Sequence, residues 1–445
     1  MIKKQENRKK WKKWKKKMNQ KKQLKISLPI AFEYLVNIFM TLVDTIAVSL
    51  IGTKELGAIG AMSVIINMMQ MSIQTINVTN TALVAKEVGE KNEDKVKLIS
   101  GNSLILTIII SIITILIIAL IKPIFPTLFN VDAICNTYLV IRLMGFIQSS
   151  IVTVLSGQQR TLGKQGNILV LRILAVICNL ILDILVVKLG YGIEGVAFVT
   201  IAIDTILAIY LLIKANSTIQ YKFNIPIIKN IFNLFKWNFV ERIVTRVDNF
   251  VFNILVSRMG ELEYAVHVIL IQIKDIEEAF IQGFGDGITI SIGVASGKKQ
   301  KDYMQQVKQI AKKVITKVSI IIPIVVLGIA LVVMYISLRT PELQMIYYTV
   351  LPILLIATYV NITATYYFSI IRGIRDFKFL AQRNFVSSLI KIIIAIILAY
   401  TPLGIIGVWL SYLVYSLVQK YMSKIQLQKK EKYQEGETNE GNCKI

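Results

Sequence analysis

Apolar stretches of about twenty residues recur along the whole chain and are separated by short charged segments. A helix needs about twenty apolar residues to cross the hydrocarbon core of a bilayer, and twelve stretches meet that requirement. They cover residues 26–50, 58–82, 98–121, 133–156, 168–188, 194–214, 232–257, 264–292, 311–336, 345–370, 380–400 and 404–424. The seventh and eighth contain "ERIVTRVDNF" and "IQIKDIEEAF", and charged side chains there must face protein or water. The pattern predicts an all-α integral membrane protein with twelve transmembrane helices.

Composition agrees with a membrane protein and adds a basic tail. Of the 445 residues, 54% are hydrophobic and 18% are charged, against about 25% charged in an ordinary soluble domain. The formal net charge is +24, and residues 1–25 hold thirteen Lys or Arg against the single acid Glu6. We interpret this tail as a cytoplasmic segment that touches anionic lipid headgroups. A nucleic-acid arm is the less favoured alternative, so we expect no nucleic-acid partner.

The distribution of Lys and Arg between loops predicts the orientation. Loops after even-numbered stretches hold twenty-one of these residues, and loops after odd-numbered stretches hold five. Basic loops close to helix ends resist translocation. We therefore expect both termini in the cytoplasm of a cell.

The chain repeats itself. "EYLVNIFMTLVDTIAVSLIG" (33–52) matches "ERIVTRVDNFVFNILVSRMG" (241–260) at a shift of 208, and "GIEGVAF" (192–198) matches "GIIGVWL" (404–410) at a shift of 212. The repeat predicts two six-helix bundles in parallel orientation, the architecture of secondary transporters. The expected parts are a basic tail (1–25), an N-terminal lobe (26–214), a cytoplasmic linker (215–231), a C-terminal lobe (232–424) and a cytoplasmic tail (425–445).

Acidic residues do not follow the repeat. Asp44 aligns with Phe252, and the pair Asn179 and Asp183 aligns with Lys391 and Ala395. The sequence therefore predicts a buried acidic cluster in the first half alone.

Helical spacing brings further polar side chains of the first half onto shared faces. Residues three or four apart lie on one side of a helix. The inward candidates are Glu33, Asn37 and Asp44 on the first stretch, Gln70, Gln74 and Asn77 on the second, Asn179 and Asp183 on the fifth, and Thr200 and Asp204 on the sixth. Four helices of one bundle are thus predicted to turn polar stripes inward.

A charge at mid-bilayer costs about 2.5–3.5 kcal/mol, so several unpaired carboxylates would consume much of a domain stability of about 5–15 kcal/mol. A proton, a metal cation or a basic partner must neutralise them. Carboxylate, amide and hydroxyl oxygens suit hard cations, and such a set is offered by Asp44, Asn179, Asp183 and Thr200. Arg172 is the candidate for a static salt bridge. We favour ion or proton coupling.

Three motifs carry a family resemblance. "LPIAFEYLVNIFMTLVDTIAVSLIGTKELGAIG", "ALVAKEVGEKNEDKVKLI" and "VICNLILDILVVKLGYGIEGVAFVT" resemble the multidrug and toxic compound extrusion (MATE) family, closest to its archaeal and DinF-like branch. The resemblance extends over about residues 25–425 and implies two six-helix bundles in a V. It further implies that Asp44, Asn179, Asp183 and Thr200 line a sodium or proton site, and that the first helix bends at Pro29.

Two features depart from that family pattern. The tenth stretch, "YYTVLPILLIATYVNITATYYF", lacks the acid of the NorM-like branch, whereas the eighth is unusually charged. Lys274 and Glu278 stand four apart and are expected to pair. The single histidine of the chain, His267, is interpreted as a packed polar residue, and the three cysteines show no paired or zinc-binding spacing.

These observations favour a monomeric antiporter that exports amphipathic, cationic organic compounds in exchange for Na⁺ or H⁺, with no other cofactor. A lipid-linked oligosaccharide flippase of the same superfamily is the main alternative, because Arg142 and Lys391 lie in mid-helix and could meet a pyrophosphate. An intramembrane aspartyl enzyme that uses Asp44 and Asp183 stays open, although no GxSxG, HExxH or P-loop pattern is present in the sequence.

Overall fold

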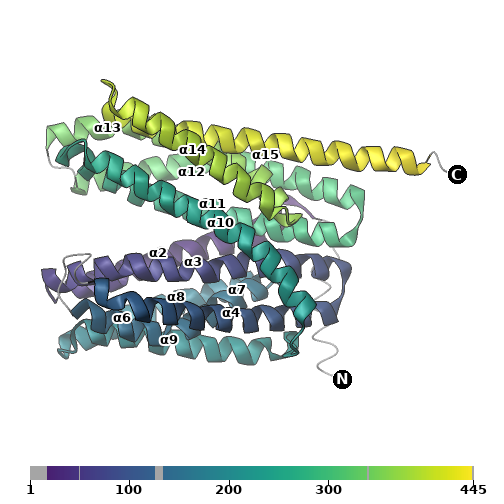
Figure 1. Ribbon diagram of the computed structural model, residues 1–445, viewed down its shortest axis with the longest axis horizontal. Helices are drawn as coiled ribbons and strands as arrows, with labels where there is room; N and C mark the ends of the chain where they lie inside the picture. The colour runs from purple at the N-terminus through teal and green to yellow at the C-terminus, as the bar shows by residue number, and fades with distance from the viewer. Residues whose placement is uncertain (1–17, 50, 126–133, 338–339, 443–445) are drawn as a thin grey trace. The chain divides into compact units, whose positions relative to one another are not determined.

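The computed structural model describes residues 18–49, 51–125, 134–337 and 340–442. Within these ranges all regular structure is helical (Figure 1). The helices are α2 (Gln20–Ser49), α3 (Thr53–Glu90), α4 (Glu93–Ile121), α6 (Ile134–Met144), α7 (Phe146–Thr161), α8 (Gln165–Lys188), α9 (Gly192–Ala215), α10 (Ile225–Ser257), α11 (Glu261–Lys298), α12 (Lys301–Ser337), α13 (Pro341–Gly373), α14 (Phe377–Ala399) and α15 (Gly404–Asn442), with short 3₁₀ turns η1 (Lys122–Ile124) and η2 (Asn216–Thr218). Each predicted stretch coincides with one helix, except that the fourth is divided between α6 and α7.

The helices differ in how apolar they are. Six are long and apolar enough to cross a membrane, namely α4, α8, α9, α12, α13 and α14, and the bent pair α6 and α7 qualifies as a seventh span. The other five, α2, α3, α10, α11 and α15, are 30 to 39 residues long. They are less apolar because α2, α3, α10 and α11 carry polar and acidic side chains that the structure buries.

Helix α8 shows an inside-out distribution of polarity. It buries Asn179 and Asp183 completely, while Val170 and Ile181 are 56% and 60% exposed. In water this arrangement would be unfavourable, because apolar area outside and carboxylates inside both cost free energy. In hydrocarbon the exposed apolar side chains of α8 no longer cost free energy, so this face of the helix is suited to contact lipid.

Packing divides the described chain into two compact units. The first comprises Phe32–Phe239 with Gly297–Lys299, and the second comprises Met18–Ala31, Val240–Ser296 and the residues from Gln300 onward. Helices α2, α10 and α11 each contribute residues to both units. The lobe boundaries drawn from the sequence stay a prediction, and most of the basic tail, residues 1–17, lies outside the described residues.

In the second unit, the start of α2 packs closely on α11. A Cβ on Gly283 would lie 2.1 Å from Ala31 Cα, and one on Gly287 would lie 2.2 Å from Ser27 Oγ. Two glycines one turn apart therefore allow the two backbones to approach. Pro29 lies inside the same segment, and α2 continues through it as one helix; the bend inferred at this proline stays a prediction.

The linker between the two repeats is held against the first unit. Asn102 on α4 donates through Nδ2 to the Lys222 carbonyl (2.9 Å), and its Oδ1 accepts from the Asn224 amide (2.9 Å). Next to it, a Cβ on Gly101 would lie 2.0 Å from the Gln220 carbonyl oxygen. One amide side chain thus satisfies two linker backbone groups.

We expect Asn102→Ala to loosen the linker. Each lost hydrogen bond contributes about 0.5–1.5 kcal/mol, so tryptic cleavage after the exposed Lys222 should become several-fold faster in limited proteolysis. Asn253→Ala is the matched control, because among the described residues Asn253 Nδ2 donates only to the Asn249 carbonyl of its own helix (2.8 Å). Equal cleavage rates for the two variants would contradict the assigned role of Asn102.

Helix α15 continues beyond its apolar part and packs on polar residues of the second unit. Asp376, in the turn before α14, accepts from Lys430 Nζ (2.8 Å) and Gln426 Nε2 (3.0 Å). Lys308 on α12 pairs with Glu431 (2.7 Å). Burial would raise the pKa of Asp376, but the hydrogen bonds from Lys430 and Gln426 outweigh that effect and hold the pKa below its ordinary value.

This lowered pKa makes a prediction about stability and pH. A carboxyl whose pKa is lower in the folded than in the unfolded state stabilises the fold above about pH 4, and the contribution is lost as pH falls through the folded pKa. Asp376→Asn should lower the free energy of unfolding by about 0.5–1 kcal/mol at pH 7, and the difference should disappear in acid. Thermal unfolding in detergent from pH 7 to pH 3 measures it, with the exposed Asp302→Asn as control. A difference independent of pH would refute the ionic origin.

Candidate functional site

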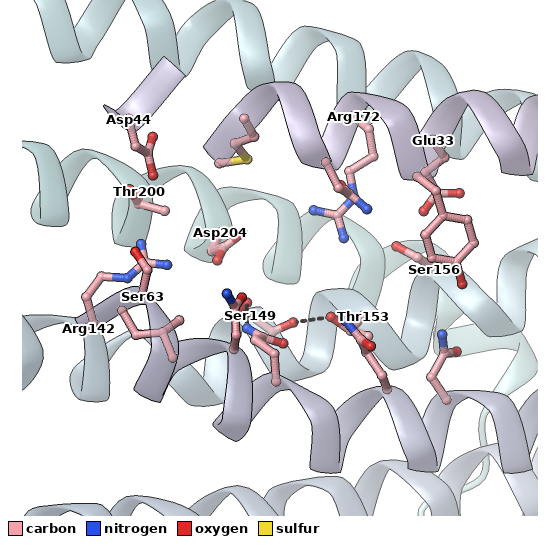
Figure 2. Close-up of a pocket in the computed structure, with 18 of the residues that line it drawn as sticks. Glu33, Asp44, Ser63, Arg142, Ser149, Thr153, Ser156, Arg172, Thr200 and Asp204 are labelled. Carbon is pink, nitrogen blue, oxygen red and sulfur yellow. Dashed lines mark hydrogen bonds between the residues drawn. The ribbon is translucent and has the colours of Figure 1, made fainter. Parts of the chain in front are cut away.

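A cavity of about 240 Å³ lies within the first unit (Figure 2). Eight of the predicted site residues line it: Glu33, Asn37, Asp44, Gln70, Gln74, Asn77, Thr200 and Asp204. They come from α2, α3 and α9. Figure 2 shows Asp44 and Thr200 toward one end of the cavity and Glu33 toward the other, with Asp204 between them. The structure thus brings together polar stripes that sequence spacing had assigned to separate helices.

Asn179 and Asp183, both completely buried on α8, are not among the residues that line the cavity. The Asp183 carboxyl lies within hydrogen-bonding reach of the Asp44 carboxyl. Neither oxygen of Asp183 and neither polar atom of the Asn179 amide has a hydrogen-bond donor or acceptor among the described residues. Two ionised carboxylates supply no donor to each other, so this pair needs a proton or a cation to be satisfied.

The oxygen set fits a hard cation. Thr200 donates its hydroxyl proton to the Val196 carbonyl (3.1 Å), which leaves the lone pairs of its oxygen able to accept. Asp44, Asp183 and Asn179 add carboxylate and amide oxygens, the ligand types that alkali cations prefer. No group of three or more His, Cys, Asp or Glu side chains that could hold a metal occurs in the described part of the chain. The set of Asp44, Asp183, Asn179 and Thr200 has two carboxylates, one amide and one hydroxyl, so it is not a group of that kind.

A break in the fourth span shapes the cavity wall. Helices α6 and α7 meet at Gly145 with a bend of 48°. A Cβ on Gly145 would lie 2.5 Å from Ile201 Cγ1, so the glycine lets the break pack directly on α9 beside Thr200. The same break directs Arg142, at the end of α6, into the cavity.

Three arginines line the cavity together with the acids. Arg160 pairs with Glu33 (3.4 Å), and both are buried. Arg142 interacts electrostatically with Asp44 and Asp183, whereas Arg172 faces Asp204. Arg172, considered from the sequence as a static partner of Asp183, acts electrostatically on Asp204, whereas the arginine that acts on Asp183 is Arg142.

Arg142 is the residue whose place the sequence did not reveal. The sequence places Arg142 in mid-helix, and on that basis it is expected as a pyrophosphate contact of a flippase. Which acids it would meet depends on the packing of α6 against α2, α8 and α9, which no spacing rule specifies.

Comparison with known proteins decides the family. The MatE family model matches residues 29–185 and 239–419. The chain belongs to the MatE family. The MATE resemblance drawn from the three motifs is thereby confirmed, and the chain is a transporter-family member rather than an enzyme. Its assignment to the DinF-like branch stays a prediction.

Relatives of this MatE protein include a curated sequence and solved structures. It is 24% identical over 312 residues to the probable multidrug resistance protein NorM of Thermotoga maritima, and the match spans 64% of this chain and 65% of that relative. A MOP superfamily transporter from Pyrococcus furiosus shares 18% identity with a TM-score of 0.83, covering 93% of this chain and 97% of that one. A Vibrio cholerae MATE transporter shares 17% identity with a TM-score of 0.85, covering 93% and 97%. These structures confirm the predicted helical membrane transporter fold with two repeated halves.

The second unit of this MatE chain corrects one expectation. The prediction that only the first half buries an acidic cluster is wrong, since Asp248 and Glu277 are 2% and 1% exposed. Asp248 pairs with Lys391 Nζ at 3.0 Å, and Glu277 accepts from Thr358 (2.7 Å) and Asn361 (3.2 Å). The comparison by aligned positions missed these acids because they occupy positions where the first repeat has methionines, Met40 and Met69.

Two smaller expectations for the second unit are confirmed. Lys274 and Glu278 form an ion pair of 3.7 Å along α11. His267 is completely buried and packs on the rings of Phe252 (5.4 Å between centroids) and Trp409 (5.7 Å). The unusual charge of α11 is thus partly balanced within its own unit.

The tight contact at Gly145 can be tested. Gly145→Ala should destabilise the MatE fold by about 1–3 kcal/mol through overpacking on Ile201, and Ile201→Ala in the same chain should recover part of that loss. Gly166→Ala on α8 is the matched control, because nothing lies within 4 Å of its Cβ position. The readout is the thermal unfolding midpoint in detergent. Identical midpoints for Gly145→Ala and Gly166→Ala would contradict the close approach.

Proposed function

We propose that this MatE protein is a secondary active efflux transporter. It exports amphipathic, cationic organic compounds by antiport with Na⁺ or H⁺ through alternating access. The observation that carries the proposal is the Asp44–Asp183 pair beside a cavity lined by polar side chains. Asp183 is completely buried and Asp44 half-buried, and both Asp183 oxygens and Asp44 Oδ1 lack a hydrogen-bond donor among the described residues. Family membership and the multidrug resistance name of the Thermotoga maritima relative support it.

When both carboxyls are ionised, the pair carries two negative charges against the one positive charge of Arg142 that acts on it, and the coupling ion supplies further positive charge. In this chain Asp44, Asp183, Asn179 and Thr200 would hold it. A ligand changes a conformational equilibrium only when its affinity differs between the two states. Residues on α2, α8 and α9 jointly form the site, so any relative shift of these helices alters that affinity. Inward movement of one charge supplies about 2.3 kcal/mol per 100 mV.

The substrate class follows from the residues that line the cavity. Asp204 offers an acidic group, and Tyr138 offers an aromatic face. Rings and carboxylates together suit amphipathic cations. We place the protein in the cell membrane as a monomer with both termini in the cytoplasm, as the distribution of basic residues between loops favours.

A lipid-linked oligosaccharide flippase is the second candidate. The three arginines of the cavity favour it, because guanidinium groups bind phosphate through paired hydrogen bonds. The related Pyrococcus furiosus transporter is itself described as having a binding pocket of reverse polarity. Lys391 gives less support than the sequence implied, since Asp248 neutralises it inside the second unit.

Neutralising either carboxylate of the pair should abolish coupled efflux. Asp44→Asn and Asp183→Asn each keep side-chain size and remove the charge that the coupling ion satisfies. We expect at least a tenfold loss in the initial rate of dye efflux from proteoliposomes in which sodium and pH gradients are imposed separately.

Asp302→Asn is the matched control, because that acid is exposed on α12. Full gradient-driven efflux by both site variants would refute the assignment of the coupling site. Absence of efflux by the wild-type protein, with transfer of a lipid-linked glycan instead, would favour the flippase.

A further inference from the structure

Arg142 borders two voids of the first unit. It lines the 240 Å³ cavity, and it also lines a second void of about 10 Å³ together with Gln70, Ser149 and Asp204. A void of this size holds about one water molecule. Figure 2 shows Arg142 at the same end of the cavity as Asp44 and Thr200, with Asp204 farther along. Arg142 therefore borders space and polar side chains on two sides, with room for one water molecule on the side of Ser149.

Acids on three different helices act on this one side chain. Asp44 on α2, Asp183 on α8 and Asp204 on α9 all interact with it electrostatically. Of the other charged groups that line the cavity, Glu33 and Arg160 pair with each other at 3.4 Å, and Arg172 faces Asp204. Tyr138, one turn before Arg142, is the remaining titratable neighbour. Arg142 is thus the basic side chain that acts on both acids of the Asp44–Asp183 pair.

The charge count shows what this cation does. Glu33, Asp44 and Asp204 line the cavity together with Arg142, Arg160 and Arg172, and Asp183 acts on Arg142 from beside it. With all four acids ionised, four negative and three positive charges leave a net charge of −1. An arginine is always protonated in a protein. Without Arg142 the same site would carry −2, and the Asp44–Asp183 pair of the empty transporter would lose the arginine that acts on both its carboxyls, which is strongly unfavourable for a carboxylate as buried as Asp183.

We propose that Arg142 is a tethered counter-cation of the Asp44–Asp183 site. It neutralises the carboxyl pair when no coupling ion is bound, and it turns toward Asp204 when an ion takes its place. The inference rests on the proposed function and adds a specificity determinant to it. Because the bound ion must displace a guanidinium attached to the same chain, a cation such as Na⁺ binds more weakly than the oxygen ligands alone would allow.

The displacement also links ion binding to helix movement. Arg142 stands three residues before the break at Gly145, and that glycine packs on Ile201 of α9. A guanidinium that changes partner from the α2 and α8 carboxyls to the α9 carboxyl changes the contacts across these helices. The bound and empty states therefore differ in their interhelical contacts, as a coupled carrier requires.

The test measures Na⁺ binding to the purified full-length protein in detergent. The readout is the rise of the thermal unfolding midpoint with NaCl concentration, compared with choline chloride at equal ionic strength. Arg142→Gln should bind Na⁺ at least tenfold more tightly than the wild type, because the competing charge is gone. Arg142→Lys, which keeps the charge, should bind Na⁺ as weakly as the wild type. Adding Asp183→Asn to Arg142→Gln should abolish the gained affinity.

Equal Na⁺ affinity of Arg142→Gln and the wild type would overturn the proposal, as would a gain of affinity in Arg142→Lys equal to that in Arg142→Gln. If Arg142→Gln does not fold, Arg142→Gln with Asp204→Asn restores the original charge balance and should show the same gain. This assay measures binding alone, so a wild-type protein that fails to export dye while its variants follow the expected Na⁺ pattern would refute the efflux function and leave the role of Arg142 standing.

Discussion

The constraint on which the rest of the structure depends is the burial of carboxyl groups inside a bundle that faces lipid. A helix such as α8 turns its apolar side chains outward and places Asn179 and Asp183 inside, completely buried. A carboxylate in such surroundings must be neutralised. How each carboxylate is neutralised separates the parts of the molecule that serve as scaffold from the part that can exchange a ligand.

The two units solve this problem differently. In the second unit Asp248 has a direct partner in Lys391 at 3.0 Å, and that ammonium also lies over the Phe252 ring at 4.1 Å. Such an enclosed pair resists exchange, because separating it exposes two buried charges. In the first unit Arg142 acts on the Asp44–Asp183 pair electrostatically, and the Asp183 oxygens have no hydrogen-bond donor in the part of the chain that the structure describes. The Asp248–Lys391 pair of the second unit is fixed, whereas the Asp44–Asp183 pair of the first unit can accept a bound ion.

Sequence reasoning succeeded where a local pattern controls the structure. Each of the twelve predicted stretches is helical, and eight predicted site residues line one cavity. It failed where the result depends on which helices become neighbours. The aligned repeats pointed to Phe252 and so missed Asp248 one turn earlier, and Arg172 was assigned to Asp183 on its own helix while the neighbouring α6 supplied Arg142.

The sequence by itself determined that this protein is a helical, duplicated membrane protein with polar stripes in its first half, because apolar length, helical period and repeats are local properties of the chain. The tertiary structure alone decided the partners of each buried charge. A break at Gly145, made possible by a missing side chain against Ile201, brings Arg142 toward the acids of three helices. The physical reason is that charge neutralisation in a low-dielectric interior depends on distances between elements, and those distances follow from packing.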